Sequence, residues 1–371
     1  MADMPAGPWV LVIGAHRSGT SAVTGALVAL GLQGVDPSDR MDWEASNPEH
    51  FESLTAALYD DDLLTTMGGS WDAPPEPGRW PDPTAEPAFG RSPDEIMAAA
   101  YPSPGPLVWK DPRVCLLLPY WRGVLPGPLT AVFVWRDPLS VARSLQARDG
   151  MSVEYGLALW ERYNRSAAEG LRGVDTYVVD YRSVVEDPQG TLAAVAGWLR
   201  DLDRFGPGAD RWDVGAAARS VDRGLFHQSG DRGADGATVP ADATGMADWL
   251  RSVGGGHRGF APEPPAPVSP WPEALVAVRR DELFLVRELR AEIRTLELDL
   301  ERSRHHGEAM ERDLRSGYQT EIDRLVDDLH TSRERADALE RELRQVTSST
   351  SWKVTRPLRS AATRRPRPPA G

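Results

Sequence analysis

The sequence predicts an α/β fold with a central parallel sheet flanked by helices, followed by a long C-terminal helix. Two apolar runs, Trp9–Ile13 and Thr130–Trp135, each lead through a turn into a segment with apolar residues at helical spacing. This strand-then-helix pattern is typical of a parallel sheet. Residues 273–346 contain no proline and are dominated by Glu, Arg, Leu and Asp, which indicates a helical extension.

A loop flanked by Gly14 and Gly19 joins the first apolar run to the helix that follows it. Gly14 and Gly19 allow the backbone to approach a ligand closely, and the amides of the loop and of the first helical turn favour an anion. An ATP-hydrolysing loop has the pattern G-x-x-x-x-G-K-[ST], whereas Gly19 is followed here by Thr20. The sequence therefore predicts a P-loop-like phosphate site without the lysine that contacts a γ-phosphate.

Polar side chains within this loop strengthen the predicted anion site. Arg17 supplies a cation, and Ser18 and Thr20 supply hydroxyls beside it. An anion that carries no γ-phosphate is therefore expected. The candidate nucleotide-binding residues of the loop are Gly14, His16, Arg17, Ser18, Gly19, Thr20 and Ser21.

A second candidate site follows the apolar run Thr130–Trp135. Arg136 ends the predicted strand, and Ser144 lies in the predicted helix that follows. A forked guanidinium and a small hydroxyl together suit a phosphate dianion. Taken alone, Arg136 and Asp137 also fit a surface ion pair at a helix start, so the prediction depends on the two sites together.

The R-S-G-T-S sequence at 17–21 resembles the 5'-phosphosulfate loop of sulfotransferases that use 3'-phosphoadenosine 5'-phosphosulfate (PAPS). Arg136 and Ser144 resemble the pair that binds the 3'-phosphate of PAPS in that family. Further segments resemble bacterial family members, in order and spacing, over roughly the first two hundred residues. They are Asn47–Glu52 (N-P-x-G-x-F-E, here one residue shorter and without the glycine), Leu63–Asp72, Trp109–Arg113 (K-D-P-R) and Tyr177–Thr191 (V-x-Y-E-D-L-x-x-D-P).

The resemblance implies transfer of the sulfuryl group of PAPS to a hydroxyl acceptor, with release of the 3',5'-bisphosphate PAP. In-line transfer depends on positioning and on neutralising charge, so no metal is required. Arg17 is expected to hold the 5'-phosphate and the leaving oxygen. Lys110, at the end of a predicted strand, is expected to contact the bridging oxygen, and Arg113 to steer sulfate or an acidic acceptor.

The acceptor hydroxyl also needs a general base within hydrogen-bond reach. Glu52 is the first candidate and His50 the second. Simpler interpretations stay open for these residues. Lys110 and Asp111 fit an ion pair across the turn before Pro112, and Glu52 fits a solvated helix residue or a cap partner.

Two other functions remain as alternatives. The first is a small-molecule kinase on the same P-loop scaffold, which Thr20 disfavours because it stands where the phosphate-binding lysine belongs. The second is a non-catalytic scaffold that acts through its coiled coil and carries a degenerate nucleotide-binding domain. A degenerate domain is disfavoured because the candidate binding and catalytic residues are all present: Arg17, Lys110, Arg136 and Ser144.

The predicted organisation has four parts: a sulfotransferase domain at 1–255, a Pro/Gly-rich linker at 256–272, a coiled coil at 273–346 and a basic, disordered tail at 347–371. Within the domain, the Pro- and Gly-rich stretch Ala73–Gly105 is expected to be an insertion or a lid rather than core.

Composition limits the functional class. A net charge of −13 argues against a general nucleic-acid binder, and a single cysteine provides neither a disulfide framework nor a cysteine zinc site. No apolar run is long enough to span a membrane, and Trp9–Ile13 is too short for a signal sequence. A cytoplasmic protein is expected, with a peripheral position at the inner face of the membrane left open.

The C-terminal region carries a coiled-coil pattern with one shift of phase. Its apolar positions are Ile293, Leu296, Leu300, Met310 and Leu314, then Ile322, Leu325, Leu329, Ala336, Leu339, Leu343 and Val346. A parallel homodimer is expected, because one continuous helix would form a rod of about 110 Å, too long for the domain to cover. A lone helix that folds back on the domain is the alternative.

The segment Ser348–Arg359 resembles the S-x-S-W-[RK]-x-T-x-P-L-R tail that follows coiled coils in bacterial cell-surface glycan biosynthesis proteins. The resemblance favours a carbohydrate hydroxyl as acceptor. The basic residues after it favour contact with an anionic membrane surface or with an acidic partner in glycan assembly, although a solvated tail fits them too.

Overall fold

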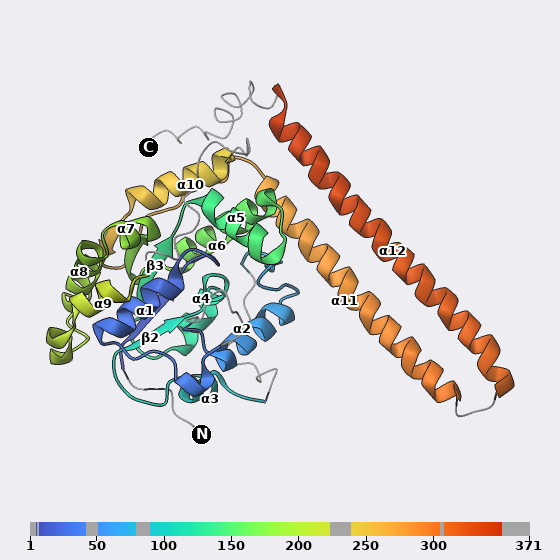
Figure 1. The fold of residues 1–371 in the computed structure, drawn as a ribbon, viewed down its shortest axis with the longest axis horizontal. Coiled ribbons are helices and arrows are strands. Elements are labelled where there is room, and N and C mark those ends of the chain that lie inside the picture. The colour runs from blue at the N-terminus through green and yellow to red at the C-terminus, as the bar shows by residue number, and fades with distance from the viewer. Residues whose placement is uncertain are drawn as a thin grey trace, which may run out of the picture. The chain divides into compact units, whose positions relative to one another are not determined.

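The computed structural model of the chain describes Pro5 and residues 7–41, 51–78, 90–222, 239–304 and 308–350. The candidate base His50 and the tail from Ser351 onward lie outside the described residues. The chain divides into two compact units, one of residues 1–67 with 76–272 and the other of residues 68–75 with 273–371. Each unit is described by itself below (Figure 1).

The first unit is built on a sheet that, within the described residues, has five strands in the order β2-β1-β3-β4-β5. The first four strands run parallel, and β5 pairs antiparallel with β4. The strands are β1 (Trp9–Ile13), β2 (Leu107–Lys110), β3 (Thr130–Trp135), β4 (Asp175–Asp180) and β5 (Gly255–His257). The mixed α/β class predicted from the sequence is confirmed.

Helices connect these strands and cover both faces of the sheet (Figure 1). In the first unit they are α1 (Thr20–Leu30), α2 (Leu54–Thr66), α3 (Pro93–Ala100), α4 (Val114–Val124), α5 (Pro138–Asp149), α6 (Val153–Gly170), α7 (Tyr181–Glu186), α8 (Pro188–Arg200), α9 (Val214–Ser220) and α10 (Ala241–Ser252), with 3-10 turns at Pro37–Asp39 and Pro207–Arg211.

The alternation of side chains along the strands builds the two sides of the core. Val10 and Val12 of β1 point to the face where α1, α8 and α9 pack. On strand β2, Trp109 contacts Trp121 of α4, with ring centroids 4.8 Å apart. Both faces of the inner strands are therefore buried, which explains why these strands read as continuous apolar runs in the sequence.

The register of the parallel strands fixes where the site lies. Val12 of β1 is opposite Lys110 of β2, and Ile13 is opposite Phe133 of β3. The chain leaves β1, forms β2 on one side of it and then forms β3 on its other side. The carboxyl end of β1 is thus the switch point of the sheet, where α/β folds bind ligands.

One stretch differs from its sequence-based expectation. Ala73–Gly105 was expected to lie outside the core, but part of it forms α3, which buries Ile96, Met97 and Ala100. Ser92 and Glu95 form a capping box at its start, with each side chain bonded to the other residue's backbone amide. Residues 79–89 of this stretch lie outside the described residues.

The Pro/Gly-rich stretch at 256–272 lies on the first unit. It contributes to β5, buries Phe260, and accepts a hydrogen bond from Arg165 Nη1 at the Pro265 carbonyl, 2.6 Å away. Farther along, Asp242 of α10 accepts a hydrogen bond from the hydroxyl of Ser269 at 2.6 Å.

The second unit contains α11 (Trp271–Arg304) and α12 (Glu308–Ser348), which run antiparallel (Figure 1). Arg333 Nε of α12 lies 3.7 Å from Glu282 Oε1 of α11, and Leu289 and Leu325 are buried. The expectation of one continuous rod is therefore wrong: an antiparallel hairpin lets the apolar seam pack within a single chain. Dimerisation stays a prediction. Among the described helices, none has both the length and the hydropathy of a membrane span.

Candidate active site

The loop after β1 approaches its neighbours so closely that only glycine fits at two positions. A Cβ on Gly14 would lie 2.1 Å from the carbonyl oxygen of Val134, and a Cβ on Gly19 would lie 2.2 Å from the ring of Tyr181. Gly19 also has a φ of 90°, in the left-handed region, and precedes the first residue of α1. The loop thus packs against β3 and the start of α7.

Arg17 joins the two candidate phosphate sites. Its Nε donates a hydrogen bond to Ser144 Oγ of α5, at 2.8 Å, and Arg136 Nη1 donates to the Arg17 carbonyl, at 3.4 Å. Arg17 has a φ of 68°, a conformation that costs a non-glycine residue about 1 kcal/mol or more and is characteristic of functional sites. The structure therefore brings together the loop cation and the Arg136/Ser144 pair.

The remaining polar groups of the loop fit an oxyanion. Ser18 is fully buried, and its hydroxyl has no hydrogen-bond partner among the described residues. Thr20 and Ser21 form the first turn of α1, where backbone amides lack partners within the helix. Because Ser144 Oγ accepts from Arg17, its own proton can be donated to a ligand oxygen. Hydroxyl and amide donors of this kind are what a phosphate binds.

Arg136 is held in place by aromatic neighbours. Its guanidinium carbon lies 5.5 Å from the ring centroid of Tyr181, and its backbone carbonyl accepts a hydrogen bond from Trp160 Nε1 at 3.0 Å. Burial lowers the pKa of the Arg136 guanidinium, but an arginine remains charged. The ring of Tyr181 therefore contacts both the Gly19 turn and Arg136, which belong to the two candidate phosphate sites.

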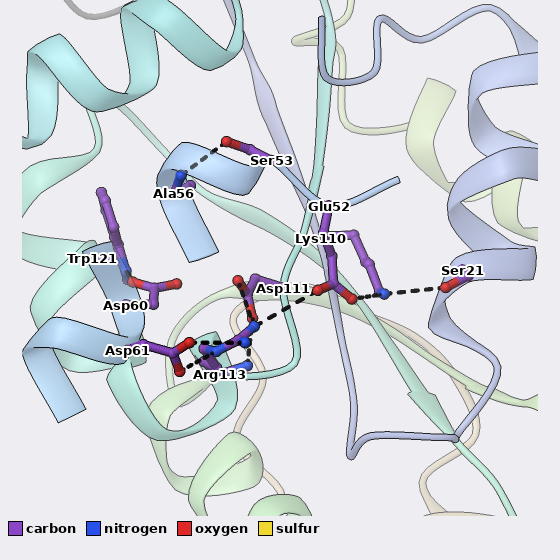
Figure 2. Close-up of polar contacts among 10 residues, drawn as sticks. All are labelled: Ser21, Glu52, Ser53, Ala56, Asp60, Asp61, Lys110, Asp111, Arg113 and Trp121. Carbon is purple, nitrogen blue, oxygen red and sulfur yellow. Dashed lines mark hydrogen bonds and ion pairs between the residues drawn. The ribbon is translucent and has the colours of Figure 1, made fainter. Parts of the chain in front are cut away.

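Lys110 lies beside α1 at the end of β2, as shown in Figure 2. Its ammonium forms an ion pair with Glu52 and donates a hydrogen bond to Ser21 Oγ, at 3.1 Å. Both Lys110 and Glu52 are buried. The candidate lysine, the candidate base and the first turn of α1 thus meet at one place, and Glu52 is no solvated helix residue.

Arg113 faces three carboxylates (Figure 2). Nε and Nη2 donate to the two oxygens of Asp61, at 2.6 and 3.2 Å, while Nη1 donates to Asp111 Oδ1 at 3.1 Å and lies 3.7 Å from Glu52 Oε2. Burial lowers the pKa of Arg113, but Asp111, Asp61 and Glu52 together raise it well above its ordinary value. The expectation that Arg113 steers an anionic ligand stays a prediction, and in this structure its guanidinium is paired with acidic side chains.

Two of the acidic groups in this cluster, Asp60 and Asp111, are buried and have raised pKa values. Burial, and then the charge of Asp111, raises the pKa of Asp60 well above its usual range, although Trp121 Nε1 donates to Asp60 at 2.8 Å. Burial also raises the pKa of Asp111 to about 6, against the opposing effect of Arg113. The environment of Asp60 therefore favours its protonated form, whereas Asp111, with a pKa of about 6, is mostly ionised at neutral pH.

His16 lies near this cluster. Its ring packs edge-on against Tyr163, with centroids 5.4 Å apart. Loss of solvation, followed by the charges of Arg113, Arg148, Lys110 and Arg17, holds the pKa of His16 well below its ordinary value. The imidazole is therefore neutral at physiological pH and adds no charge to the anion site.

Sequence reasoning missed Tyr181, Asp60 and Asp61 as parts of the site. Tyr181 directly follows β4, whose carboxyl end lies beside that of β3, so its position after a strand was a usable signal. Asp60 and Asp61 lie in an acidic run on α2, and the run gives no sign of which carboxylate is buried.

No family model matches the chain, and no curated protein matches it. Among solved structures, the chain is similar to the sulfotransferase domain from the Synechococcus PCC 7002 olefin synthase. The identity is 16%, the TM-score is 0.40, and the match covers 67% of this chain and 96% of that one. The function is therefore argued from the residues of the site.

Proposed function

We propose that the protein is a PAPS-dependent sulfotransferase that transfers a sulfuryl group to a hydroxyl acceptor. The observation that carries this proposal is the hydrogen bond from Arg17 to Ser144, together with that from Arg136 to the Arg17 carbonyl. These contacts bring the loop between Gly14 and Gly19 next to the residues that follow β3. A nucleotide with two phosphate groups needs two such sites close together.

The donor would be held by the loop and by α5. The amides at the start of α1, the hydroxyl of Ser18 and the guanidinium of Arg17 would bind the 5'-phosphate, while Arg136 and Ser144 would bind the 3'-phosphate. PAPS would supply the sulfuryl group. The loop has no lysine after Gly19, which favours a donor without a γ-phosphate.

Lys110 and Glu52 would carry the chemistry. Lys110 is buried and donates a hydrogen bond to the first turn of α1, which supports a role in neutralising an oxygen that gains negative charge. Glu52 is an acceptor-only group at the same place, so one of its oxygens would take the proton of the acceptor hydroxyl. The ion pair between them holds the two groups together before a substrate binds.

The acceptor is proposed to be a carbohydrate hydroxyl of a cell-surface glycan or of a glycosylated metabolite. This part of the proposal is supported by the sequence of the tail at 348–359. A partner in glycan assembly, or an anionic membrane surface, is proposed to bind the basic residues that follow, with the protein in the cytoplasm.

Transfer of radioactive sulfate from labelled PAPS to a panel of sugars and glycolipids tests the proposal directly. We expect transfer in the presence of EDTA, and we expect Lys110→Ala to lower the single-turnover rate about 100-fold or more while changing PAP affinity less than about threefold. Transfer of phosphate from ATP that requires magnesium would instead support the kinase. An absence of any nucleotide binding would support the scaffold.

A further inference from the structure

We propose that Arg113 is a positioning residue for Glu52, with Asp61 and Asp111 fixing its guanidinium for that task. The inference rests on the proposed function, in which Glu52 is the general base. Arg113 is the N-terminal cap residue of α4, and its side chain reaches across to α2 and to the residue two positions before α2 (Figure 2).

The two oxygens of Glu52 face different cations. Oε1 pairs with Lys110, and Oε2 lies 3.7 Å from Arg113 Nη1. A carboxylate with a separate partner on each oxygen cannot rotate about its terminal bond without losing both interactions. Arg113 and Lys110 together therefore fix the plane of the Glu52 carboxylate, with one oxygen directed at the ammonium and the other at the guanidinium.

The guanidinium of Arg113 is itself fixed. Asp61 binds its Nε and Nη2 in the parallel two-bond geometry that gives arginine–carboxylate pairs their directionality. On the other edge, Nη1 donates to Asp111, whose Oδ1 also accepts from the Arg113 backbone amide at 2.8 Å. The two aspartates thus fix the plane of the guanidinium, with Nη1 turned toward Glu52 Oε2 at 3.7 Å.

The backbone of Glu52 is restrained as well. Its carbonyl accepts a hydrogen bond from the Met41 amide at 2.9 Å, and the next residue, Ser53, caps α2 through a 2.9 Å bond from the Ala56 amide. With main chain and side chain both held, Glu52 keeps one geometry before substrate binds. Such preorganisation is what general-base catalysis gains from neighbouring residues.

The decisive experiment measures the titration of Glu52 in the full-length protein by carbon-13 NMR of labelled glutamate carboxyl groups, with Glu52→Gln used to assign the signal. Arg113→Gln should raise the Glu52 midpoint by about one pH unit or more, because an opposite charge at this distance shifts a carboxyl pKa by about 1–3 units. Arg122→Gln, on the same helix, is the control and should leave the midpoint unchanged.

Arg113→Gln leaves the carboxylates of Glu52, Asp61 and Asp111 near an uncharged amide, so a second variant is needed in case the first does not fold. The double change Asp61→Asn with Arg113→Gln keeps the net charge and should raise the midpoint as well. An unchanged Glu52 midpoint in a folded variant would overturn the inference, since Arg113 would then not act on the Glu52 carboxylate.

Kinetics separate this inference from the proposed function. If the protein transfers sulfate, Arg113→Lys should lower the single-turnover rate about 10-fold or more and change the affinity for PAP less than about threefold. In the folded Arg113→Gln variant, the acid limb of the pH–rate profile should move to higher pH, as the Glu52 midpoint does. If no acceptor is sulfated, the proposed function fails, while the NMR titration still decides whether Arg113 controls Glu52.

Discussion

At the scale of single residues, the site concentrates charge in a buried place. Lys110 and Arg113 lie among the carboxyl groups of Glu52, Asp60, Asp61 and Asp111. Charges removed from water are tolerated only when each has partners, and the structure pairs both cations with carboxylates. The raised pKa of Asp60 favours its uncharged form, and an uncharged Asp60 limits the repulsion within the cluster.

Asp60→Asn tests the protonation of this buried acid. The pKa of Asp60 is higher in the folded than in the unfolded protein, so protonated Asp60 is compatible with the fold and ionised Asp60 destabilises it. The natural protein is therefore most stable, with respect to this group, below the unfolded-state pKa. It loses stability as the pH rises toward the folded-state pKa. Asparagine is always neutral and keeps an acceptor for Trp121. We expect the variant to gain in free energy of unfolding, relative to the natural protein, between pH 5 and pH 8 in urea titrations. A constant difference across this range would contradict a raised Asp60 pKa.

At the scale of elements, the strand–loop–helix segment from β1 to α1 depends on a ring from another element. Tyr181, the first residue of α7, fills the space in which a side chain at position 19 would lie. The same ring lies under Arg136. One aromatic residue thus contacts both the loop after β1 and the arginine of the second candidate phosphate site.

Gly19→Ala tests this coupling. The new Cβ would meet the Tyr181 ring at 2.2 Å, and the left-handed φ of 90° adds strain, so we expect a loss of about 2–4 kcal/mol in stability and a marked loss of PAP binding. Gly197→Ala in α8 is the matched control: its Cβ has no neighbour within 4 Å, so about 0.5–1 kcal/mol of stabilisation is expected. Equal thermal unfolding temperatures for the two variants would argue against the close packing at Gly19.

The strands and the loop were predictable from the sequence because inner parallel strands are buried on both faces and Gly14 and Gly19 flank the turn. The contacts of Arg113 were not, since Asp61 lies far away in sequence and nothing local distinguishes it from Asp62. The helical hairpin was not predictable either. An apolar seam shows that a helix needs a partner, but it does not show whether the partner is another chain or the next part of the same one.

At the scale of the whole molecule, homodimerisation through the helical unit stays a prediction. The hairpin leaves Phe284, Leu339 and Val346 about half exposed, at 54%, 52% and 47%. Burying such side chains against a second hairpin would favour association, at about 25 cal/mol per Å². Light scattering after size exclusion should give twice the mass of one chain, and Leu339→Glu with Val346→Glu should give a single-chain mass. A monomeric natural protein would contradict the prediction.

The central claim is that two phosphate sites, one in the loop after β1 and one after β3, bind a single nucleotide. Calorimetry in EDTA with PAP and with AMP, which lacks the 3'-phosphate, tests it most directly. We expect PAP to bind about 10–100-fold more tightly than AMP, since hydrogen bonds to charged groups contribute about 1.5–3 kcal/mol. Ser144→Ala and Arg136→Ala should weaken PAP more than AMP. Equal affinities for PAP and AMP, or an equal loss of both in these variants, would contradict the claim.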